Sequence, residues 1–491
     1  MRNKFQFLNK INHRIIILSI FLIFIILSCL YLYSFDDYYD DWNFFYTVDS
    51  NINDQETWQR HYGGDRGDYI LREAYPWVFT YFIKYILKFI GYTVENTHYI
   101  LLSFSILSVF AFYKLSSLLS KDFKFKIIVM ILFCLNLFLI RELNSFRPHS
   151  PTLFLSLVSS YFYIKIFVQN LVSKKNYFIY FLTTFLMITI WPQSLALFAG
   201  QIAFSIIFFS YSKKNLVLPA IFIFYVLINI DYIFYLTVDF EWGYTPFEKK
   251  FFVNYFFRSF FGSIVFGGFM LIMFAYFLIK KLLSFNFNLK FNFNSFKKKE
   301  LNPINYFLII ILTIYSACIA YSLLKTSVMA PKYFIPLLPI IILWIGYNIY
   351  LTRSNFLLYG TIVLTIINCI YFWNDLPIDR PPMREALQIV NEKNIKKIFT
   401  TESIVFNNFL SNYNYAIKNK IKIIQLKNLE KKTLDKSFAI ICLNYPRFQV
   451  GNSYINKIEP KCKNVMKNVN LEILNKIRIS DFIIFITKFK Y

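Results

Sequence analysis

The chain has 491 residues, of which 57% are hydrophobic and 21% aromatic, and only 16% are charged. A water-soluble domain of this size needs more charged surface, so the composition excludes an ordinary soluble protein and predicts a membrane protein. The formal net charge of +25 does not indicate a nucleic-acid partner. Much of the lysine and arginine lies in short loops between apolar runs, where it sets membrane topology.

Apolar runs of about 20 residues recur through the chain as far as residue 373, and we predict an α-helical polytopic protein with about eleven spans. With the N-terminus in the cytoplasm, the basic loops all fall on the inner side, as the positive-inside rule requires. The acid-rich loop after the first span and the turns 141–150 and 325–333 then lie outside. The predicted spans are 15–33, 98–119, 127–140, 151–169, 177–191, 193–211, 216–238, 260–282, 303–324, 334–351 and 355–373.

Four carboxylates follow the first span at once: Asp36, Asp37, Asp40 and Asp41. They gain nothing from burial in lipid, so we expect them in water or in a cavity at the membrane face. A carboxylate near other carboxylates has a raised proton affinity, which suits a general base. A solvated acidic loop, or a divalent-cation site without catalysis, is the alternative interpretation.

The segment 74–91 is apolar and aromatic but carries Lys84 and Lys88, which are one helical turn apart. We predict an amphipathic helix in the outer interface with both lysines on its wet side, because burying them in lipid costs several kcal/mol, of order 3 each. A twelfth span with both lysines extended toward the headgroups is the alternative. It would invert every later loop and break the charge pattern.

The turn between the third and fourth spans holds Arg141, Glu142, Arg147 and His149. Arginine offers a planar fork of donors to phosphate oxygens, so this turn is a candidate phosphate site at the outer face. The alternative interpretation is that these basic residues anchor the turn to lipid headgroups. Lys332, which precedes Tyr333 at the start of a late span, is a further basic residue on the outer side of the membrane.

The character of the chain changes after residue 373. Prolines at 377, 381 and 382 mark a linker, and residues 374–491 hold no span-length apolar run. We predict a small α/β domain on the extracytoplasmic side, with helices between its first three strands. The expected strands are 395–400, 421–426, 438–443 and 482–488. The domains are therefore 1–373, which includes the first outer loop 34–97, and 374–491.

Two of the six cysteines, Cys442 and Cys462, lie in the predicted soluble domain. An oxidising outer compartment allows a disulfide between them, although spacing alone does not show their geometry. The other four cysteines lie in or beside apolar spans and are expected as small buried hydrophobes. The sequence has no CxxC pair and its four histidines are dispersed, so no metal site is predicted.

Four motifs, in their order and on one side of the membrane, resemble those of a known superfamily. An Asp-Asp pair follows the first span, and an acidic residue precedes an aromatic-proline run in the first loop. A turn resembles the Glu-x-Arg-Pro-Tyr turn, and a later segment resembles an Arg-Tyr-x-x-Pro-x-x-Pro start of a span. The acidic pair is Asp40 and Asp41 (or Asp36 and Asp37). The other three motifs are, in the same order, residues 73–77, 141–149 and 332–339. The membrane part thereby resembles the lipid-linked-sugar glycosyltransferases of the GT-C class, nearest bacterial relatives of protein mannosyltransferases and aminoarabinose transferases.

The resemblance implies an inverting glycosyltransferase of the cytoplasmic membrane that uses a polyprenyl-phosphate sugar at the outer face. It implies an aspartate as base, for which we favour Asp40 and Asp41, and basic residues that hold the lipid phosphate. The acceptor is a glycan, a lipid or a protein; no nucleotide is used, and a divalent cation stays open. His149 stands where the family has tyrosine, and Lys332 stands where it has arginine. The implied substrate-binding residues are Arg72, Glu73, Arg141, Glu142, Arg147, His149, Lys332 and Tyr333.

Two other functions fit the same composition. An oligosaccharide polymerase or ligase also uses lipid-linked glycans, but such enzymes carry their basic residues in a large mid-chain outer loop. A lipid or glycan flippase places charges within its spans and often shows an internal repeat. This sequence has little charge inside its spans and no clear repeat.

Overall fold

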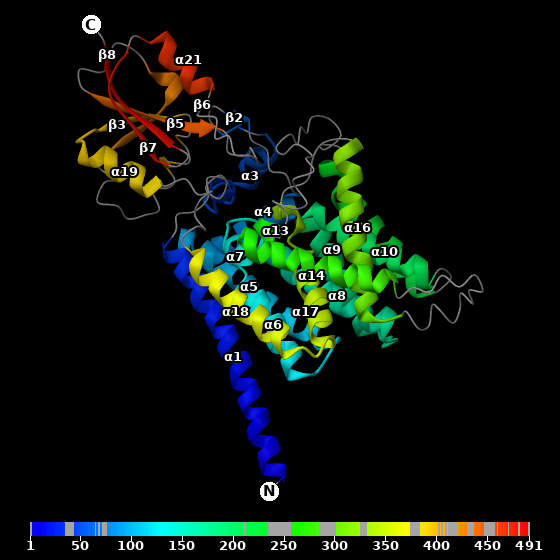
Figure 1. Cartoon of the computed structure of the whole chain (residues 1–491). Helices are drawn as coiled ribbons and strands as arrows, with labels where there is room; N and C mark the ends of the chain where they lie inside the picture. Colours follow the sequence, from blue (N-terminus) through cyan, green and yellow to red (C-terminus); the bar gives the residue numbers. More distant parts are fainter. Residues whose placement is uncertain are drawn as a thin grey trace. The chain divides into compact units, whose positions relative to one another are not determined.

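The computed structural model shows a mostly helical chain with a small C-terminal sheet (Figure 1). The residues it describes are 2–34, 44–63, 65–66, 69–70, 76–209, 213–233, 257–283, 301–324, 331–373, 383–400, 403, 406–407, 410, 421–429, 437–445, 457–458, 460–469, 471–479 and 482–489. Asp36, Asp37, Asp40, Asp41, Arg72 and Glu73 lie outside the described residues.

Contacts divide the chain into two units. The first comprises Met1–Tyr31, Leu101–Asn144 and Pro148–Asn374, and the second comprises Leu32–Ile100, Ser145–Arg147 and Asp375–Tyr491. The first unit is a bundle of apolar helices. Its helices and helical turns, some of which extend past the unit, are α1 (Arg2–Ser34), α5 (Val94–Ser116), α6 (Phe123–Cys134), α7 (Leu137–Leu143), α8 (His149–Tyr163), η2 (Ile164–Val168), α9 (Lys174–Ile190), η3 (Pro192–Ser194), α10 (Leu195–Phe209), η4 (Lys213–Leu216), α11 (Val217–Ile228), α13 (Phe257–Phe261), α14 (Ile264–Leu283), α16 (Pro303–Leu324), η6 (Pro331–Phe334), α17 (Leu338–Leu351) and α18 (Asn355–Tyr371).

All eleven predicted spans overlap helices, but fewer of these are long enough to cross a bilayer. Among the described residues, five helices have the length and apolarity of a span, and a sixth results if α6 and α7, bent by 56°, count as one. The five are His13–Leu32, Val94–Ser116, His149–Val168, Ile264–Leu283 and Pro303–Leu324. Four shorter apolar helices are Pro192–Phe208, Lys214–Ile228, Leu338–Leu351 and Asn355–Tyr371. The 14 residues of α17, for example, rise only about 21 Å, against an apolar core of about 30 Å.

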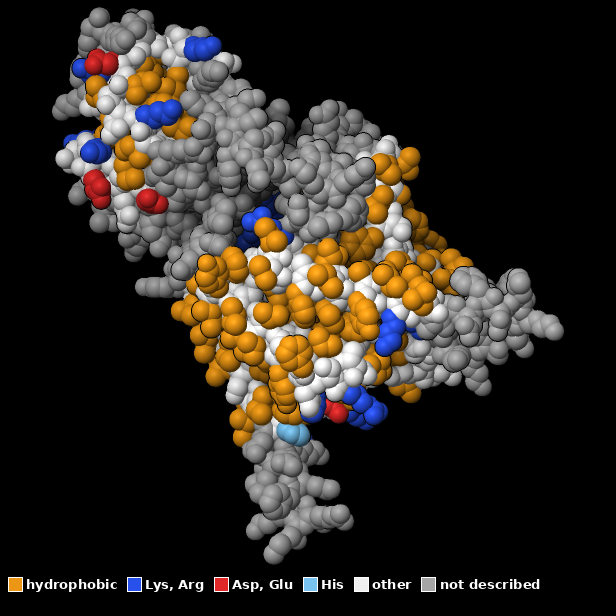
Figure 2. All heavy atoms as spheres, viewed as in Figure 1, with side chains coloured by type: hydrophobic (Ala, Val, Ile, Leu, Met, Phe, Trp, Pro, Cys, Tyr) orange, Lys and Arg blue, Asp and Glu red, His pale blue; other side chains and the backbone are white. Residues whose placement is uncertain are grey.

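Large apolar side chains cover most of the visible face of the helical unit (Figure 2). Exposed examples are Leu18, Phe222, Val265, Leu324 and Phe356, each at least half exposed. A protein in water rarely shows contiguous apolar surface of this kind, whereas lipid tails cover it without cost. By contrast α17 is buried on nearly every side, since it packs against α6, α14, α16 and α18. The exposed surface and the buried central helix are those of a membrane bundle.

A buried polar network joins four of these helices around Gln201 of α10. Its Oε1 accepts a hydrogen bond from the Tyr180 hydroxyl at 2.8 Å, and its Nε2 donates to Ser159 Oγ at 3.1 Å and to the Tyr306 hydroxyl at 3.2 Å. Tyr163 donates to the Gln201 carbonyl at 2.9 Å. Helices in lipid gain no hydrophobic drive to pair, so such hydrogen bonds and close packing fix which faces meet. The network sets the register of α8, α9, α10 and α16.

Two adjacent glycines of α14 give a matched test of this packing. A Cβ on Gly267 would lie 2.6 Å from the Phe257 carbonyl oxygen and 2.8 Å from its carbon, whereas a Cβ on Gly268 meets nothing within 4 Å. Backbone atoms cannot yield as a flexible side chain can. We therefore expect Gly267→Ala to destabilise the fold by about 1–3 kcal/mol. Gly268→Ala should be neutral or slightly stabilising, because alanine favours helix. Thermal unfolding of both variants in one detergent checks this, and equal shifts would contradict the close approach of α13 and α14.

In the second unit, a segment after the first helix packs against the amphipathic helix α4 (Trp77–Ile90). This segment holds α3 (Asp54–Trp58), the helical turn η1 (Gln59–Gly63) and a small hairpin of β1 (Asp65–Arg66) and β2 (Tyr69–Ile70). The buried face of α4 carries Phe79, Ile83 and Leu87, at helical spacing. Phe44 stacks on Phe79 with ring centroids 5.1 Å apart.

The expectation that both lysines of α4 face water was wrong for one of them. Lys88 is exposed, but Lys84 is only 2% exposed. Its Nζ donates to Asp54 Oδ1 and to Thr57 Oγ1, each at 2.7 Å. The same Asp54 accepts from the Tyr85 hydroxyl at 2.6 Å. A buried ammonium persists when a carboxylate and a hydroxyl replace its water, and the sequence-distant Asp54 supplies that here.

The C-terminal part of this unit is a mixed sheet with strand order β4-β3-β5-β8-β7, and β6 pairs with β5. β3 is parallel to β4 and β5, while β8 runs antiparallel to β5 and to β7. The four predicted strands correspond to β3 (Lys397–Thr400), β4 (Lys422–Gln425), β5 (Phe438–Tyr445) and β8 (Phe482–Phe489). Between β4 and β5, where a helix was predicted, lies the helical turn η8 (Leu426–Asn428). Elements not predicted are α19 (Met383–Glu392), β6 (Lys457–Ile458), α21 (Pro460–Asn468) and β7 (Leu471–Ile479).

Cys442 of β5 and Cys462 of α21 form a disulfide in this structure, with their Cα atoms 5.9 Å apart. Both residues are fully buried, in a core that includes Phe399, Phe438 and Phe485. A disulfide restricts the unfolded chain, so this one stabilises the docking of α21 on the sheet.

Candidate functional site

The candidate site begins where α7 ends and α8 starts. Asn136 caps α7 by accepting a hydrogen bond from the Leu139 amide at 3.0 Å, which starts the helix one residue after the break from α6. Arg141 and Glu142 occupy the last turn of α7, where a cation is favoured by the negative end of the helix dipole. His149 is the first residue of α8, directly after Pro148. The intervening turn brings His149 back beside Glu142.

Glu142 links these groups. Arg141 donates to Glu142 Oε1 through Nη2 at 2.9 Å and through Nε at 3.0 Å. His149 Nδ1 lies 3.1 Å from the other oxygen, Oε2. Lys332, from the distant turn η6, is near enough for its charge to act on Glu142 as well. One carboxylate thus faces several basic groups, and the cluster keeps a net positive charge.

An aromatic row connects this turn with η6. The rings of His149 and Trp191 meet edge to face with centroids 5.1 Å apart, and Trp191 lies 6.1 Å from the Tyr333 ring. Trp191 is the C-terminal cap of α9, and Pro192 then forces the chain into η3. We call Arg141, Glu142, His149, Trp191, Lys332 and Tyr333 the Glu142 cluster. Trp191 was not predicted as a site residue. The only signal in the sequence was a Trp-Pro break between two apolar runs.

Buried polar atoms without a hydrogen-bond partner gather in the same chain segments. They are the hydroxyls of Ser150, Thr152 and Ser194 and the side-chain oxygens of Asn144 and Gln193, within the described part of the chain. Each lies within three residues of a cluster residue in sequence. Buried polar atoms are nearly always satisfied by protein, water or a ligand. These groups could therefore take hydrogen bonds from a polar ligand or from water.

The structure thus brings together five of the predicted site residues from two separate motifs: Arg141, Glu142, His149, Lys332 and Tyr333. Arg147 lies in the turn between α7 and α8 and belongs by its contacts to the second unit. The four aspartates of the first loop, with Arg72 and Glu73, are outside the described residues, so their roles stay predictions. Among the residues that the structure describes, no group of three or more His, Cys, Asp and Glu side chains could hold a metal ion.

Of the comparisons with known proteins, the one with solved structures finds matches. No protein-family model and no curated protein matches the chain. Twelve chains of solved structures match. One is the archaeal oligosaccharyltransferase AglB from Archaeoglobus fulgidus, in complex with an inhibitory peptide and a dolichol-phosphate. The identity is 13% and the TM-score 0.43, over 82% of this chain and 64% of that one. The chain covers less than two thirds of that protein's length, so that protein's activity and ligands do not transfer to this chain by likeness alone.

Proposed function

We propose that this chain is a GT-C-type glycosyltransferase of the cytoplasmic membrane, which moves a sugar from a polyprenyl-phosphate donor to an acceptor at the outer face. The observation that carries the proposal is the Glu142 cluster. It joins an arginine, a histidine and a lysine from two separate turns of an apolar helical bundle. Charged side chains in a membrane bundle are costly, and they mark substrate sites by default.

The chemistry of the cluster fits a phosphate with a lipid tail. The Arg141 guanidinium offers a planar fork of donors, and Lys332 adds a point charge. Glu142 holds Arg141 and His149 in place through both of its oxygens, so the donors are oriented before any substrate binds. The buried hydroxyls of Ser150, Thr152 and Ser194 are suited to the sugar or to a phosphate oxygen.

The proposed reaction is a single inverting displacement. A carboxylate of the first loop, Asp40 or Asp41, takes the proton of the acceptor's hydroxyl or amine. The acceptor oxygen or nitrogen bonds to the anomeric carbon as the bond from that carbon to the phosphate oxygen breaks. The polyprenyl phosphate leaves with the bonding electron pair, and its new charge is stabilised by Arg141 and Lys332. Asp36, Asp37, Arg72, Glu73 and Arg147 complete the proposed site.

The placement outside the cell is part of the proposal and has two supports. The loop charges follow the positive-inside rule if the first loop and the C-terminal domain are outside. The Cys442–Cys462 disulfide is typical of an oxidising compartment.

The test is transfer by the purified full-length protein in lipid nanodiscs. It is incubated with a panel of polyprenyl-phosphate sugars, and glycosylated product and free polyprenyl phosphate are measured by mass spectrometry. We expect one donor to be consumed, with transfer or slow hydrolysis. A flippase would instead move the donor between leaflets of a vesicle without releasing polyprenyl phosphate. That result, with no donor consumed, would overturn the proposal.

A further inference from the structure

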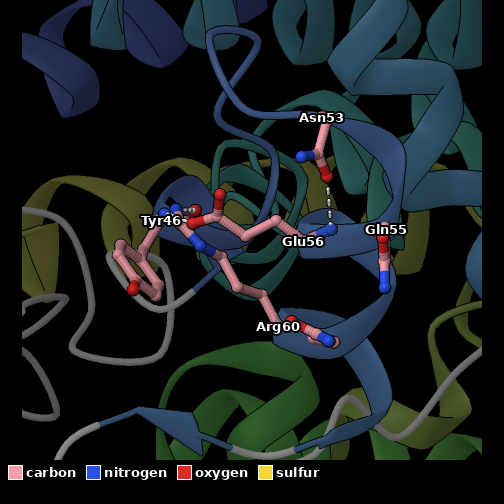
Figure 3. Close-up of a pocket in the computed structure, with 6 residues that line it drawn as sticks. Tyr46, Asn53, Gln55, Glu56 and Arg60 are labelled. Carbon is pink, nitrogen blue, oxygen red and sulfur yellow. Dashed lines mark hydrogen bonds and ion pairs between the residues drawn. The ribbon is translucent and has the colours of Figure 1, made fainter.

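The first loop builds a polar pocket of its own within the second unit. Its volume is about 450 Å³, within the range of about 300–1,000 Å³ that is usual for small-molecule sites. Six residues line it: Tyr46, Asn53, Gln55, Glu56, Gln59 and Arg60 (Figure 3). All belong to one short stretch of chain around α3, and Asn53, Gln55 and Gln59 are exposed, so the pocket is accessible from water.

Helix α3, which forms one wall of the pocket, is held at its start. Asn53 caps α3, because its Oδ1 accepts a hydrogen bond from the Glu56 amide at 2.8 Å (Figure 3). Asp54 ties the same helix to α4: its Oδ1 accepts from buried Lys84 at 2.7 Å, and its carbonyl accepts from the Tyr81 hydroxyl at 2.8 Å. A site held in place before its ligand arrives loses less conformational entropy on binding. The helix that carries Gln55 and Glu56 is therefore held in place by α4.

The charges that line the pocket are paired with each other. Arg60 forms an ion pair with Glu56, one turn earlier, and its Nη1 donates to the Tyr46 carbonyl at 2.7 Å. Its guanidinium also lies 3.8 Å from the centre of the Tyr46 ring. Paired charges leave the lining close to neutral. A phosphate or a metal ion would need an excess of one sign, so neither is favoured here.

The remaining lining groups are suited to hydroxyl-rich ligands. The carboxamides of Gln55 and Gln59 each offer two donors and an acceptor, and the Nδ2 of Asn53 is not used by the cap. A sugar presents hydroxyls that both donate and accept, with a partly apolar ring that can lie against an aromatic side chain such as Tyr46. A lining of amides, one aromatic ring and a paired arginine is suited to a neutral saccharide.

We propose that this pocket binds the acceptor, and that the acceptor is a neutral saccharide. The inference rests on the proposed function, since it names that reaction's second substrate. The position in the chain supports it. Asp41 precedes Tyr46 by five residues, which span at most about 18 Å when fully extended. A saccharide longer than one ring, held at Tyr46, can thus extend toward the carboxylate that would take its proton.

The first arm of the test measures binding without turnover. Saturation-transfer NMR on the full-length protein in nanodiscs uses the methyl glycosides of glucose, mannose, galactose and N-acetylglucosamine as probes. We expect at least one to bind to the wild type. The double variant Gln55→Ala/Gln59→Ala should weaken that binding about tenfold or more, because it removes both carboxamides. The matched control is Gln388→Ala, an exposed glutamine of α19 in the same unit but outside the pocket.

The second arm separates this inference from the proposed function. In a transfer assay the double variant should raise the acceptor KM while donor hydrolysis stays at the wild-type rate. Saccharide binding that depends on the two glutamines, in a protein that never transfers sugar, supports the pocket and overturns the glycosyltransferase. Transfer that the double variant leaves unchanged overturns the pocket and supports the glycosyltransferase. The inference also falls if no probe binds to the wild type, or if the double variant binds as the wild type does.

Discussion

Replacing Asp40 or Asp41 by asparagine is expected to lower the rate of sugar transfer about a hundredfold or more, while donor affinity stays near that of the wild type. Asparagine keeps the size and the hydrogen bonding of the side chain but cannot accept the acceptor's proton. A loss in kcat without a change in binding is the signature of an interaction made only in the transition state. Single-turnover transfer at saturating donor, with separate measurement of donor binding, gives both quantities.

Asp36 and Asp37 provide the comparison, because they share the loop and the charge of the favoured pair. We expect Asp36→Asn and Asp37→Asn to reduce transfer less than the changes at residues 40 and 41. An equal loss at all four positions would indicate that the cluster acts through its total charge, for example by holding a cation. If none of the four variants affects transfer, the segment is a solvated loop and the base lies elsewhere.

The helices could be predicted because apolar runs are long and their ends are marked by polar residues. Their lengths could not be predicted as well. Asn136 breaks the apolar run 127–140, which was predicted as one span, because a helix cap ends the hydrogen-bond ladder without lowering local hydrophobicity. In the C-terminal domain, β7 went unpredicted because its sequence interleaves charged and apolar residues and two of its apolar side chains, Ile473 and Leu474, are about half exposed.

The sequence predicted which residue types form the site, but it did not predict the contacts between them. Arg141, His149 and Lys332 were predicted as basic residues that bind a phosphate. The structure adds that Glu142 contacts both Arg141 and His149, and that Trp191 lies between His149 and Tyr333. The burial of Lys84 shows the same limit, because its partner Asp54 lies in a different segment. Periodicity describes one element at a time, and it does not say which distant side chain completes a charge pair.

Arg141→Ala is expected to raise the donor KM by about tenfold to a hundredfold and also to lower kcat, because Arg141 both binds the donor phosphate and stabilises the charge on it as it leaves. The change removes charge-assisted hydrogen bonds to the phosphate, which are worth about 1.5–3 kcal/mol. Arg141→Lys should recover only part of the affinity, because an ammonium cannot form the planar fork. Arg258→Ala, at an exposed arginine of α13 in the same unit, is the control for loss of a positive charge and should leave the donor KM unchanged.

Glu142 is expected to act through Arg141, and a double-mutant cycle shows this. Glu142→Gln loses the ion pair that orients the guanidinium, so on its own it should raise the donor KM in the same direction as Arg141→Ala but by less. In the double variant no guanidinium remains to be oriented, so the KM should match that of Arg141→Ala alone, and the two effects should not add. Additive effects would instead mean that Glu142 contacts the donor independently. A donor KM that neither variant changes would remove the Glu142 cluster from the substrate site and leave it a structural link between α7 and α8.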